Sequence, residues 1–293
     1  MAQIIAIANQ KGGVGKTTTA INLAASLAVA EKRALLIDLD PQGNASVGMG
    51  IEKEAIAECN VYHAIMGEVP LSKTIQNSEL PFFDICPSDN NLIGAEIELV
   101  SVFARESKLK NAISEIACHY DYILIDCPPS LGLLTVNAFT AADKFIVPLQ
   151  TEYFAMEGLA QLLNNVTLIR SSLNPNLDME GIVLTMFDKR NNLHKQVISE
   201  IREHFEDKVF DSIIPRNVKL SECPSFGKPI LLYDIESKGS EAYLALAREI
   251  ILQERRVDSS EVSTTEGPQV EQEHVAYVEQ HSSSLEEHSS LGL

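Results

Sequence analysis

Short, almost wholly apolar runs alternate along this chain with longer segments in which apolar residues recur every three or four positions. Runs that are apolar at successive positions are typical of parallel strands buried on both faces, and longer periodic segments are typical of helices. The pattern predicts strands at residues 4–8, 34–38, 82–86, 122–126, 145–148 and 182–185. It predicts helices at residues 17–30, 95–103, 108–119, 157–170, 193–205 and 240–255. This alternation predicts an α/β fold in which helices cover both faces of a mostly parallel, twisted sheet.

The end of the chain breaks this pattern. Residues 257–293 are rich in Ser, Glu, Gln and Thr and contain eight acids and no Lys or Arg, so they carry −8 of the net charge of −18. A segment with so few large apolar side chains buries too little surface to offset a backbone-ordering cost of ~1–2 kcal/mol per residue. We therefore expect one folded domain at residues 1–255 and an acidic, Ser- and Glu-rich disordered tail at residues 256–293. Three histidines recur every seven residues in the tail, and chance spacing is favoured over a metal site.

Composition and targeting signals favour a soluble cytoplasmic protein. The five cysteines are odd in number and form no CxxC pair, so reduced thiols are favoured over a disulfide framework or a zinc motif. No basic segment precedes the first apolar run, as a secretory signal would require. The longest uncharged stretch, residues 127–142, contains two consecutive prolines and is shorter than the roughly 20 apolar residues that a membrane span needs.

A glycine-rich segment lies between the first predicted strand and the first predicted helix. Glycines there let backbone N–H groups surround phosphate oxygens, and the start of a helix favours negative charge. Lys16 would neutralise the β- and γ-phosphates of a nucleotide, and the Thr17 hydroxyl would ligate Mg²⁺. The ordinary phosphate loop has a glycine six residues before that lysine, where this chain has Gln10, so the strict consensus fails. A dinucleotide fingerprint also fails, because Thr18 occupies the position of its third glycine. The predicted phosphate-binding residues are Lys11, Gly12, Gly13, Val14, Gly15, Lys16, Thr17 and Thr18.

Acidic residues follow two of the predicted strands. Asp38 and Asp40 come at and after the end of the second strand, and Asp126 ends the fourth. The carboxyl ends of parallel strands open on the ligand crevice, so these carboxylates are expected to face the phosphates. A strand that ends in Asp is the usual arrangement for a carboxylate holding Mg²⁺ through water. Asp38 alone is equally explained as a turn or helix-cap residue, and Cys127 is better explained as a core thiol than as a cluster ligand.

The order Lys-Gly-Gly-Val-Gly-Lys-Thr-Thr at residues 11–18 resembles the deviant phosphate loop of the ParA/MinD class of ATPases. From residue 2 to about residue 247, the chain is similar to the chromosome-partitioning branch of that class, ParA/Soj. Besides the loop and the acidic motifs, the similar stretches are residues 94–99, 131–138, 155–159 and 214–222. The resemblance implies a three-layer P-loop NTPase fold and makes residues 1–255 a deviant Walker A ATPase domain with ATP and Mg²⁺ as cofactors.

The resemblance also implies roles for individual residues. Lys11 reaches across a dimer to the phosphates held by the other subunit, and Asp40 positions the attacking water. Asp38 has a structural or metal-linked role nearby. The implied catalytic residues are Lys11, Lys16 and Asp40, and the implied metal ligands are Thr17 and Asp126. The implied adenine pocket is lined by Pro215, Arg216 and Asn217, which by themselves are only a turn after a short strand.

The implied function is an ATP-driven switch that segregates the origin region of a chromosome or plasmid. ATP-bound homodimers hold double-stranded DNA of the nucleoid without sequence preference, and a ParB-type protein stimulates hydrolysis. DNA contact needs cations that bind phosphates, and the candidates are Arg190, Lys195 and Lys219. The family often has Arg at the position of Lys219. The other explanation of these charges is that they belong to solvated loops. No obvious arginine finger is present, and such a group supplied in trans is worth about 10³–10⁵ in rate. We therefore predict a slow intrinsic ATPase and strong stimulation by the partner.

Two alternatives belong to the same superfamily. A MinD-like spatial regulator of division binds membrane through a basic amphipathic helix, whereas an anionic bilayer would repel the acidic end of this chain. A P-loop ligase or kinase would need a pocket for a small-molecule substrate. Only eight residues precede the glycine-rich segment, which leaves no room for an operator-binding module there and favours a chromosomal replicon.

Overall fold

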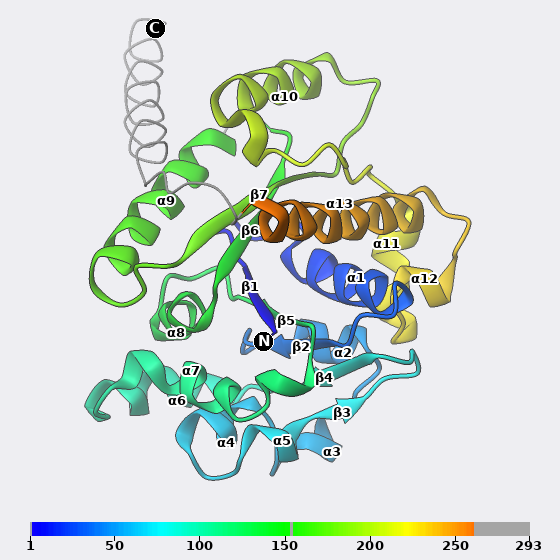
Figure 1. The fold of residues 1–293 in the computed structure, drawn as a ribbon. Coiled ribbons are helices and arrows are strands. Elements are labelled where there is room, and N and C mark those ends of the chain that lie inside the picture. The colour runs from blue at the N-terminus through cyan, green and yellow to red at the C-terminus, as the bar shows by residue number, and fades with distance from the viewer. Residues whose placement is uncertain (1, 153–154, 261–293) are drawn as a thin grey trace, which may run out of the picture.

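A seven-stranded sheet runs through the centre of the computed structural model, which describes residues 2–152 and 155–260 (Figure 1). Its strand order is β3-β4-β2-β5-β1-β6-β7, and all neighbouring strands are parallel except β3, which pairs antiparallel with β4. The strands are β1 (Gln3–Ile7), β2 (Ala34–Asp38), β3 (Gln76–Asn77), β4 (Phe83–Cys86), β5 (Tyr122–Asp126), β6 (Lys144–Gln150) and β7 (Asp178–Thr185). The two-residue edge strand β3 lies outside the predicted strands, and the other six correspond to them.

Helices cover both faces of the sheet and make it the middle of three layers (Figure 1). One face carries α1 (Lys16–Val29), α2 (Asn44–Gly48), α11 (Val218–Glu222), α12 (Ile230–Tyr233) and α13 (Lys238–Ser260). The other face carries α4 (Val61–Met66), α5 (Leu71–Thr74), α6 (Leu92–Glu98), α7 (Lys108–Ser114), α8 (Leu133–Ala141), α9 (Ala155–Ser172) and α10 (Asn192–Phe205). The remaining α-helix, α3 (Lys53–Ile56), is a single turn.

Alternate residues of the central strands face opposite layers, because side chains along a strand point to opposite faces of the sheet. In β5, Ile123 and Ile125 join the hydrophobic core beneath α8, whereas Tyr122 and Leu124 join the core beneath α1. Both faces of the strand are therefore buried, which explains why its sequence is apolar without alternation. The arrangement confirms the predicted α/β fold, a mostly parallel sheet with helices on both faces.

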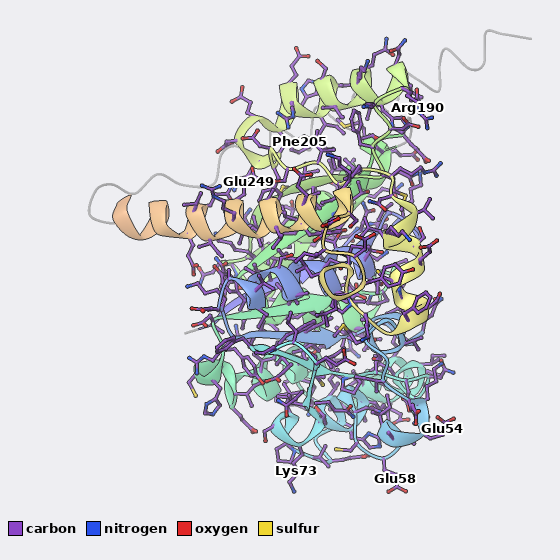
Figure 2. All side chains as sticks on the ribbon, turned by 90° about the vertical axis from the view of Figure 1, so that its right-hand side faces the viewer. Glu54, Glu58, Lys73, Arg190, Phe205 and Glu249 are labelled. Carbon is purple, nitrogen blue, oxygen red and sulfur yellow. The ribbon has the colours of Figure 1, made fainter. Side chains whose placement is uncertain are left out.

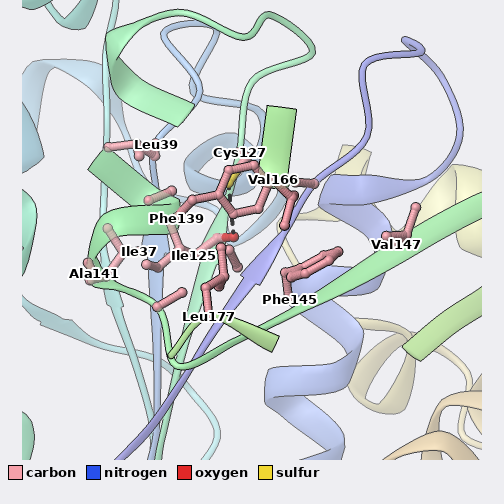
Figure 3. Close-up of a cluster of buried hydrophobic side chains, with 14 of the residues drawn as sticks. Ile37, Leu39, Ile125, Cys127, Phe139, Ala141, Phe145, Val147, Val166 and Leu177 are labelled. Atoms are coloured by element: carbon pink, nitrogen blue, oxygen red, sulfur yellow. Dashed lines mark hydrogen bonds between the residues drawn. The ribbon is translucent and has the colours of Figure 1, made fainter. Parts of the chain in front are cut away.

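The hydrophobic pattern did not predict α8. Seven of its nine residues are buried, because the helix lies against α7, α9 and the sheet, so its apolar residues do not mark a single face. Figure 3 shows Phe139 and Ala141 of this helix packed with Ile37 and Ile125 from the sheet. No helix in the described part of the chain is both long and apolar enough to span a membrane.

Several helix ends differ from the predicted ones. α6 begins at Leu92, three residues before the predicted start, and α7 ends at Ser114, where the chain passes into a looser turn. α13 continues to Ser260, past the predicted start of the tail, because residues 253–256 are good helix formers. Residues 261–293 lie outside the described residues, so disorder of the tail stays a prediction.

Candidate nucleotide-binding site

The phosphate loop connects the end of β1 to the start of α1. Gly13 and Gly15 have φ values of +74° and +89°, a left-handed conformation that residues with a Cβ rarely adopt. No described heavy atom beyond the chain neighbours lies within 4 Å of a Cβ placed on Gly12 or Gly13, so this side of the loop is open. The other side is fixed, because the Thr185 hydroxyl donates a 2.8 Å hydrogen bond to the Val14 carbonyl oxygen. The loop therefore has a fixed backbone and free space over its glycines, as phosphate binding requires.

Two buried carboxylates lie side by side at the carboxyl ends of β2 and β5. Asp38 and Asp126 are register partners in this parallel pair, and neither exposes any surface. Burial raises the pKa of Asp38 to about 6, although hydrogen bonds from Ser46 oppose the shift. Burial, and then the charge of Asp38, raise the pKa of Asp126 well above its ordinary value. Neither oxygen of Asp126 has a hydrogen-bond partner among the residues that the structure describes, which is costly unless a cation binds there.

Lys16 and Thr17 open α1 beside these carboxylates. Asp126 is also the register partner of Ile7, the last residue of β1, so β1 brings the phosphate loop to this edge of the sheet. Burial lowers the pKa of the Lys16 ammonium, and the negative charge of Asp126 opposes that shift. Thr17 in turn stabilises the charged form of Asp126 and so lowers its pKa. The Thr17 hydroxyl and the Asp126 carboxylate are oxygen ligands that fit Mg²⁺, and the Lys16 ammonium fits the nucleotide phosphates that would bind with it.

Asp40 is held by hydrogen bonds that sequence reasoning did not identify. It is 6% exposed, and its carboxylate accepts a 2.9 Å hydrogen bond from the Gln42 N–H. The Ser88 hydroxyl donates to the Asp40 carbonyl oxygen at 2.7 Å. The Ser46 hydroxyl donates to Asp38 at 2.7 Å and accepts from the Ser88 N–H at 2.9 Å. The connection between β4 and α6 is therefore tied directly to the backbone of Asp40 and, through Ser46, to the carboxylate of Asp38.

Lys11 forms an ion pair within its own chain. Its Nζ lies 2.8 Å from Glu152 Oε2, and the two side chains are 40% and 45% exposed. Its N–H donates to the Asn9 side chain at 3.0 Å, which fixes the backbone while the ammonium stays accessible. Sequence reasoning missed Glu152, although the signal is the one that identified Asp126, an acid that follows a buried strand.

The segment predicted to hold adenine lies next to the continuation of β7. Pro215 forms an isolated parallel bridge with Phe187, and the Arg216 N–H donates to the Phe187 carbonyl oxygen at 3.0 Å. Asn217 precedes α11 and accepts a hydrogen bond from the N–H of Lys219. β7 ends at Thr185, which bonds the phosphate loop, and Pro215 pairs with Phe187 two residues farther along the chain.

The three predicted DNA contacts differ in their surroundings. Arg190 lies on the outer surface beside α10, 84% exposed, and its guanidinium binds the Asp188 carboxylate at 2.8 Å (Figure 2). Lys219 pairs with Glu222 at 3.2 Å and lies over the Tyr233 ring. Lys195 is exposed on α10 and forms no ion pair with another described residue, as is also true of two further exposed cations, Lys189 and Arg216.

Cys127 belongs to the hydrophobic core. It is fully buried, its thiol lies 3.8 Å from the Ile125 carbonyl oxygen, and burial raises its pKa (Figure 3). A protonated thiol enclosed by apolar side chains fits the predicted core residue and not a cluster ligand.

The chain resembles known proteins over most of its length. Residues 2–179 match a family model described as an AAA domain. The chain is 56% identical over 251 residues to the chromosome partitioning protein ParA of Myxococcus xanthus, which covers 86% of this chain and 88% of that protein. It is 54% identical over 250 residues to the sporulation initiation inhibitor protein Soj of Bacillus subtilis, with 85% of this chain and 98% of that protein covered.

The fold is also shared with a solved structure that holds nucleotide. Cobyrinic acid a,c-diamide synthase from Mycobacterium smegmatis, with a bound ATP analogue and magnesium, has a TM-score of 0.77 and 32% identity, over 87% of this chain and 96% of that chain. More than half of the aligned residues are identical in both the ParA and the Soj relative, and each alignment covers more than four fifths of this chain. The chain belongs to the ParA/Soj family of chromosome-partitioning P-loop ATPases.

Proposed function

We propose that this partitioning ATPase is a dimerising switch. ATP binding joins two copies, the dimer holds double-stranded DNA of the nucleoid without sequence preference, and a ParB-type protein stimulates hydrolysis and releases it. The result is movement of the origin region of a chromosome or plasmid. The observation that carries the proposal is the pair of loop lysines, of which Lys16 is buried beside Asp126 and Lys11 remains accessible at the surface.

The residues of the site divide the work of ATP hydrolysis. The loop N–H groups and Lys16 bind the phosphates, and Thr17 and Asp126 hold Mg²⁺, which neutralises charge on the phosphate oxygens. Asp40, fixed by its hydrogen bonds to Gln42 and Ser88, positions the attacking water. Pro215, Arg216 and Asn217 bind adenine.

Coupling to dimerisation follows from Lys11. Its ammonium binds Glu152 in the single chain and must leave that carboxylate to reach phosphates held by a second copy. Because this cation arrives only in the dimer, intrinsic hydrolysis is slow and a partner that organises the dimer accelerates it.

DNA is bound by exposed cations around α10 and α11. Arg190 and Lys219 have carboxylate partners in their own chain, which reduces their attraction for phosphates. Lys195 has none among the described residues, so it is the strongest of the three predicted contacts, and the exposed Lys189 lies on the loop just before α10.

The alternatives, a MinD-like membrane regulator and a small-molecule ligase or kinase, receive less support. The relatives at 54–56% identity have partitioning or Soj names, whereas the synthase structure stands at 32%. The acidic residues 257–293 remain unsuited to an anionic bilayer.

One assay separates these functions. Co-sedimentation with random duplex DNA and with anionic vesicles, with and without ATP, gives ATP-dependent DNA retention that weakens with salt if the proposal is right. Lys16→Ala should abolish nucleotide binding and with it DNA retention. Vesicle retention without DNA retention would replace the proposal by the membrane regulator.

A further inference from the structure

Both carboxylate oxygens of Asp38 accept hydrogen bonds from the protein. Its Oδ1 accepts a 3.2 Å hydrogen bond from the Asp40 N–H. Its Oδ2 accepts two hydrogen bonds, from the Ser46 N–H at 2.8 Å and from the Ser46 hydroxyl at 2.7 Å. The neighbouring Asp126 differs, since neither of its oxygens has a hydrogen-bond partner among the described residues. Asp38 therefore binds the loop that follows it, whereas Asp126 offers its oxygens to Mg²⁺.

The loop that Asp38 binds contains the turn that carries Asp40. The Asp40 carbonyl oxygen accepts from the Gly43 N–H at 2.9 Å, and Oδ1 of Asp40 accepts from the Gln42 N–H at 2.9 Å. The other carboxylate oxygen of Asp40 accepts no hydrogen bond from a residue that the structure describes, so it can accept one from water. Asp38 holds this loop at its start, through Asp40, and at its end, through Ser46.

The Ser46 hydroxyl joins Asp38 to a distant part of the chain. It accepts a 2.9 Å hydrogen bond from the Ser88 N–H while it donates to Asp38. Because an N–H can only donate, the hydroxyl directs its own proton to Asp38 and not to Ser88. Ser46 and Ser88 are 2% and 1% exposed, so these hydrogen bonds lie in a dry interior where they are strong and directional.

Ser88 also contacts the turn that carries Asp40. Its hydroxyl donates to the Asp40 carbonyl oxygen at 2.7 Å. A Cβ on Gly43 would stand 3.0 Å from the Ser88 carbonyl oxygen, and the φ of Gly43 is +66°, so this close approach needs glycine. Asp38 and Ser88 therefore hold the same turn through different atoms, and the Ser46 hydroxyl is bonded to both residues.

We propose that Ser46 is a positioning residue for ATP hydrolysis. Its hydroxyl, aligned by the Ser88 N–H, orients the Asp38 carboxylate, which in turn fixes the backbone of Asp40. The carboxylate of Asp40 is thereby held where it meets the attacking water. Ser46 and Asp38 act through Asp40 and do not bind the phosphates or the metal. This proposal rests on the role of Asp40 proposed above.

The test compares Ser46→Ala with Ser46→Thr in the full chain. Ser46→Ala removes a hydrogen bond to a charged group, so phosphate release should slow on the order of 10- to 100-fold. Affinity for a fluorescent ATP analogue should stay within about twofold, because the phosphate loop and Lys16 are unchanged. Ser46→Thr keeps a hydroxyl and should restore most of the rate.

Ser26→Ala is the matched control. Ser26 is also buried, and its hydroxyl donates at 2.7 Å to the Asn22 carbonyl oxygen within α1. This variant removes the same atom from the interior and should leave the rate of phosphate release unchanged. Hydrogen exchange of the peptide that covers residues 39–48 should be faster in Ser46→Ala and unchanged in Ser26→Ala. Thermal unfolding compares the stability that the two variants lose.

A metal-linked role of Asp38 is tested by the Mg²⁺ dependence of fluorescent ADP binding. The Mg²⁺ concentration for half-maximal binding should rise much more in Asp126→Asn than in Asp38→Asn. Asp38→Asn should slow phosphate release, and adding Ser46→Ala to it should have little further effect, because Ser46 acts through Asp38. An equal rise in the Mg²⁺ concentration for both variants, or additive effects on the rate, would overturn the assignment.

The proposal for Ser46 is also overturned if Ser46→Ala hydrolyses ATP at the wild-type rate or if Ser26→Ala slows hydrolysis equally. A loss of rate that a normally folded Ser46→Thr does not restore has the same consequence. Failure of the underlying role of Asp40 looks different. It appears as normal hydrolysis by Asp40→Ala, whatever the serine variants do.

Discussion

Replacing Glu152 with Gln should strengthen the ATP-dependent dimer. In the single chain, Glu152 holds the Lys11 ammonium at 2.8 Å, and the proposed dimer needs that ammonium on the phosphates of the other copy. Each dimer therefore has to break two such ion pairs. Glu152→Gln removes the carboxylate charge and leaves Lys11 free to move, while it keeps a side chain of the same length.

The magnitude follows from the exposure of the pair. Both side chains are more than one third exposed, and ion pairs of this kind contribute ~0.2–1 kcal/mol. Two pairs per dimer give about 0.4–2 kcal/mol, which corresponds to roughly 2- to 30-fold tighter dimerisation at tenfold per 1.4 kcal/mol. Because salt screens exposed charges, the gain should shrink between 0.1 and 0.5 M salt, the range over which the Debye length falls from about 10 Å to roughly half that.

Sedimentation velocity with Mg²⁺ and a non-hydrolysable ATP analogue measures the dimer constant directly. Glu200→Gln is the control, since it makes the same charge change on the exposed surface of α10. A dimer that Glu152→Gln leaves unchanged or weakens, relative to this control, would refute the idea that the ion pair competes with dimerisation. A weakened dimer would indicate that Glu152 itself contacts the second copy.

Three further predictions concern catalysis, DNA and stability. Asp40→Ala should keep fluorescent-nucleotide binding and slow phosphate release roughly 10²–10⁴-fold, and normal hydrolysis would remove Asp40 from its role. Lys195→Ala should reduce the slope of log DNA affinity against log salt concentration by about 1 per copy. Arg190→Ala should reduce that slope by less, because an acid already neutralises the arginine, and equal effects of the two variants would contradict this. Gly227→Ala should destabilise the fold by ~1–3 kcal/mol and lower Tm by several degrees, because φ is +65° and a Cβ would stand 2.6 Å from a neighbouring backbone atom. Gly67→Ala, with φ of +80° but open space, should cost only its backbone strain, ~1–2 kcal/mol, in the same thermal-unfolding measurement.

The sequence predicted the bounds of strands most accurately where both faces of the strand are buried. β2 and β5 have the predicted bounds because every residue of both is buried, and a wholly apolar run cannot be confused with a surface segment. α10 was also predicted closely, since it buries only one face. α8 escaped prediction for the opposite reason, because a helix buried on nearly all sides has no helical period to detect.

Some features of the site follow from local sequence, whereas others depend on contacts between residues that are far apart in the chain. The phosphate loop is a continuous stretch, and strand ends in a parallel sheet place Asp38 beside Asp126 by topology alone. The hydrogen bonds between Ser46 and Ser88 join residues 42 positions apart, and the Lys11–Glu152 pair joins residues 141 apart. Such contacts depend on how the connections pack, which no local pattern records.

The net charge of −18 limits how the chain could bind DNA. An acidic chain repels DNA as a whole, so the proposed binding depends on local cations, and on and just before α10 the exposed Lys189 and Lys195 form no ion pair with another described residue. Two phosphate contacts in one copy would correspond to a log–log salt slope of about −1.8, and four in a dimer to about −3.6. The second copy therefore roughly squares the electrostatic part of the affinity. If the proposed dimer forms only with ATP, the steep dependence on the number of contacts makes DNA retention a property of the dimer and not of the single chain.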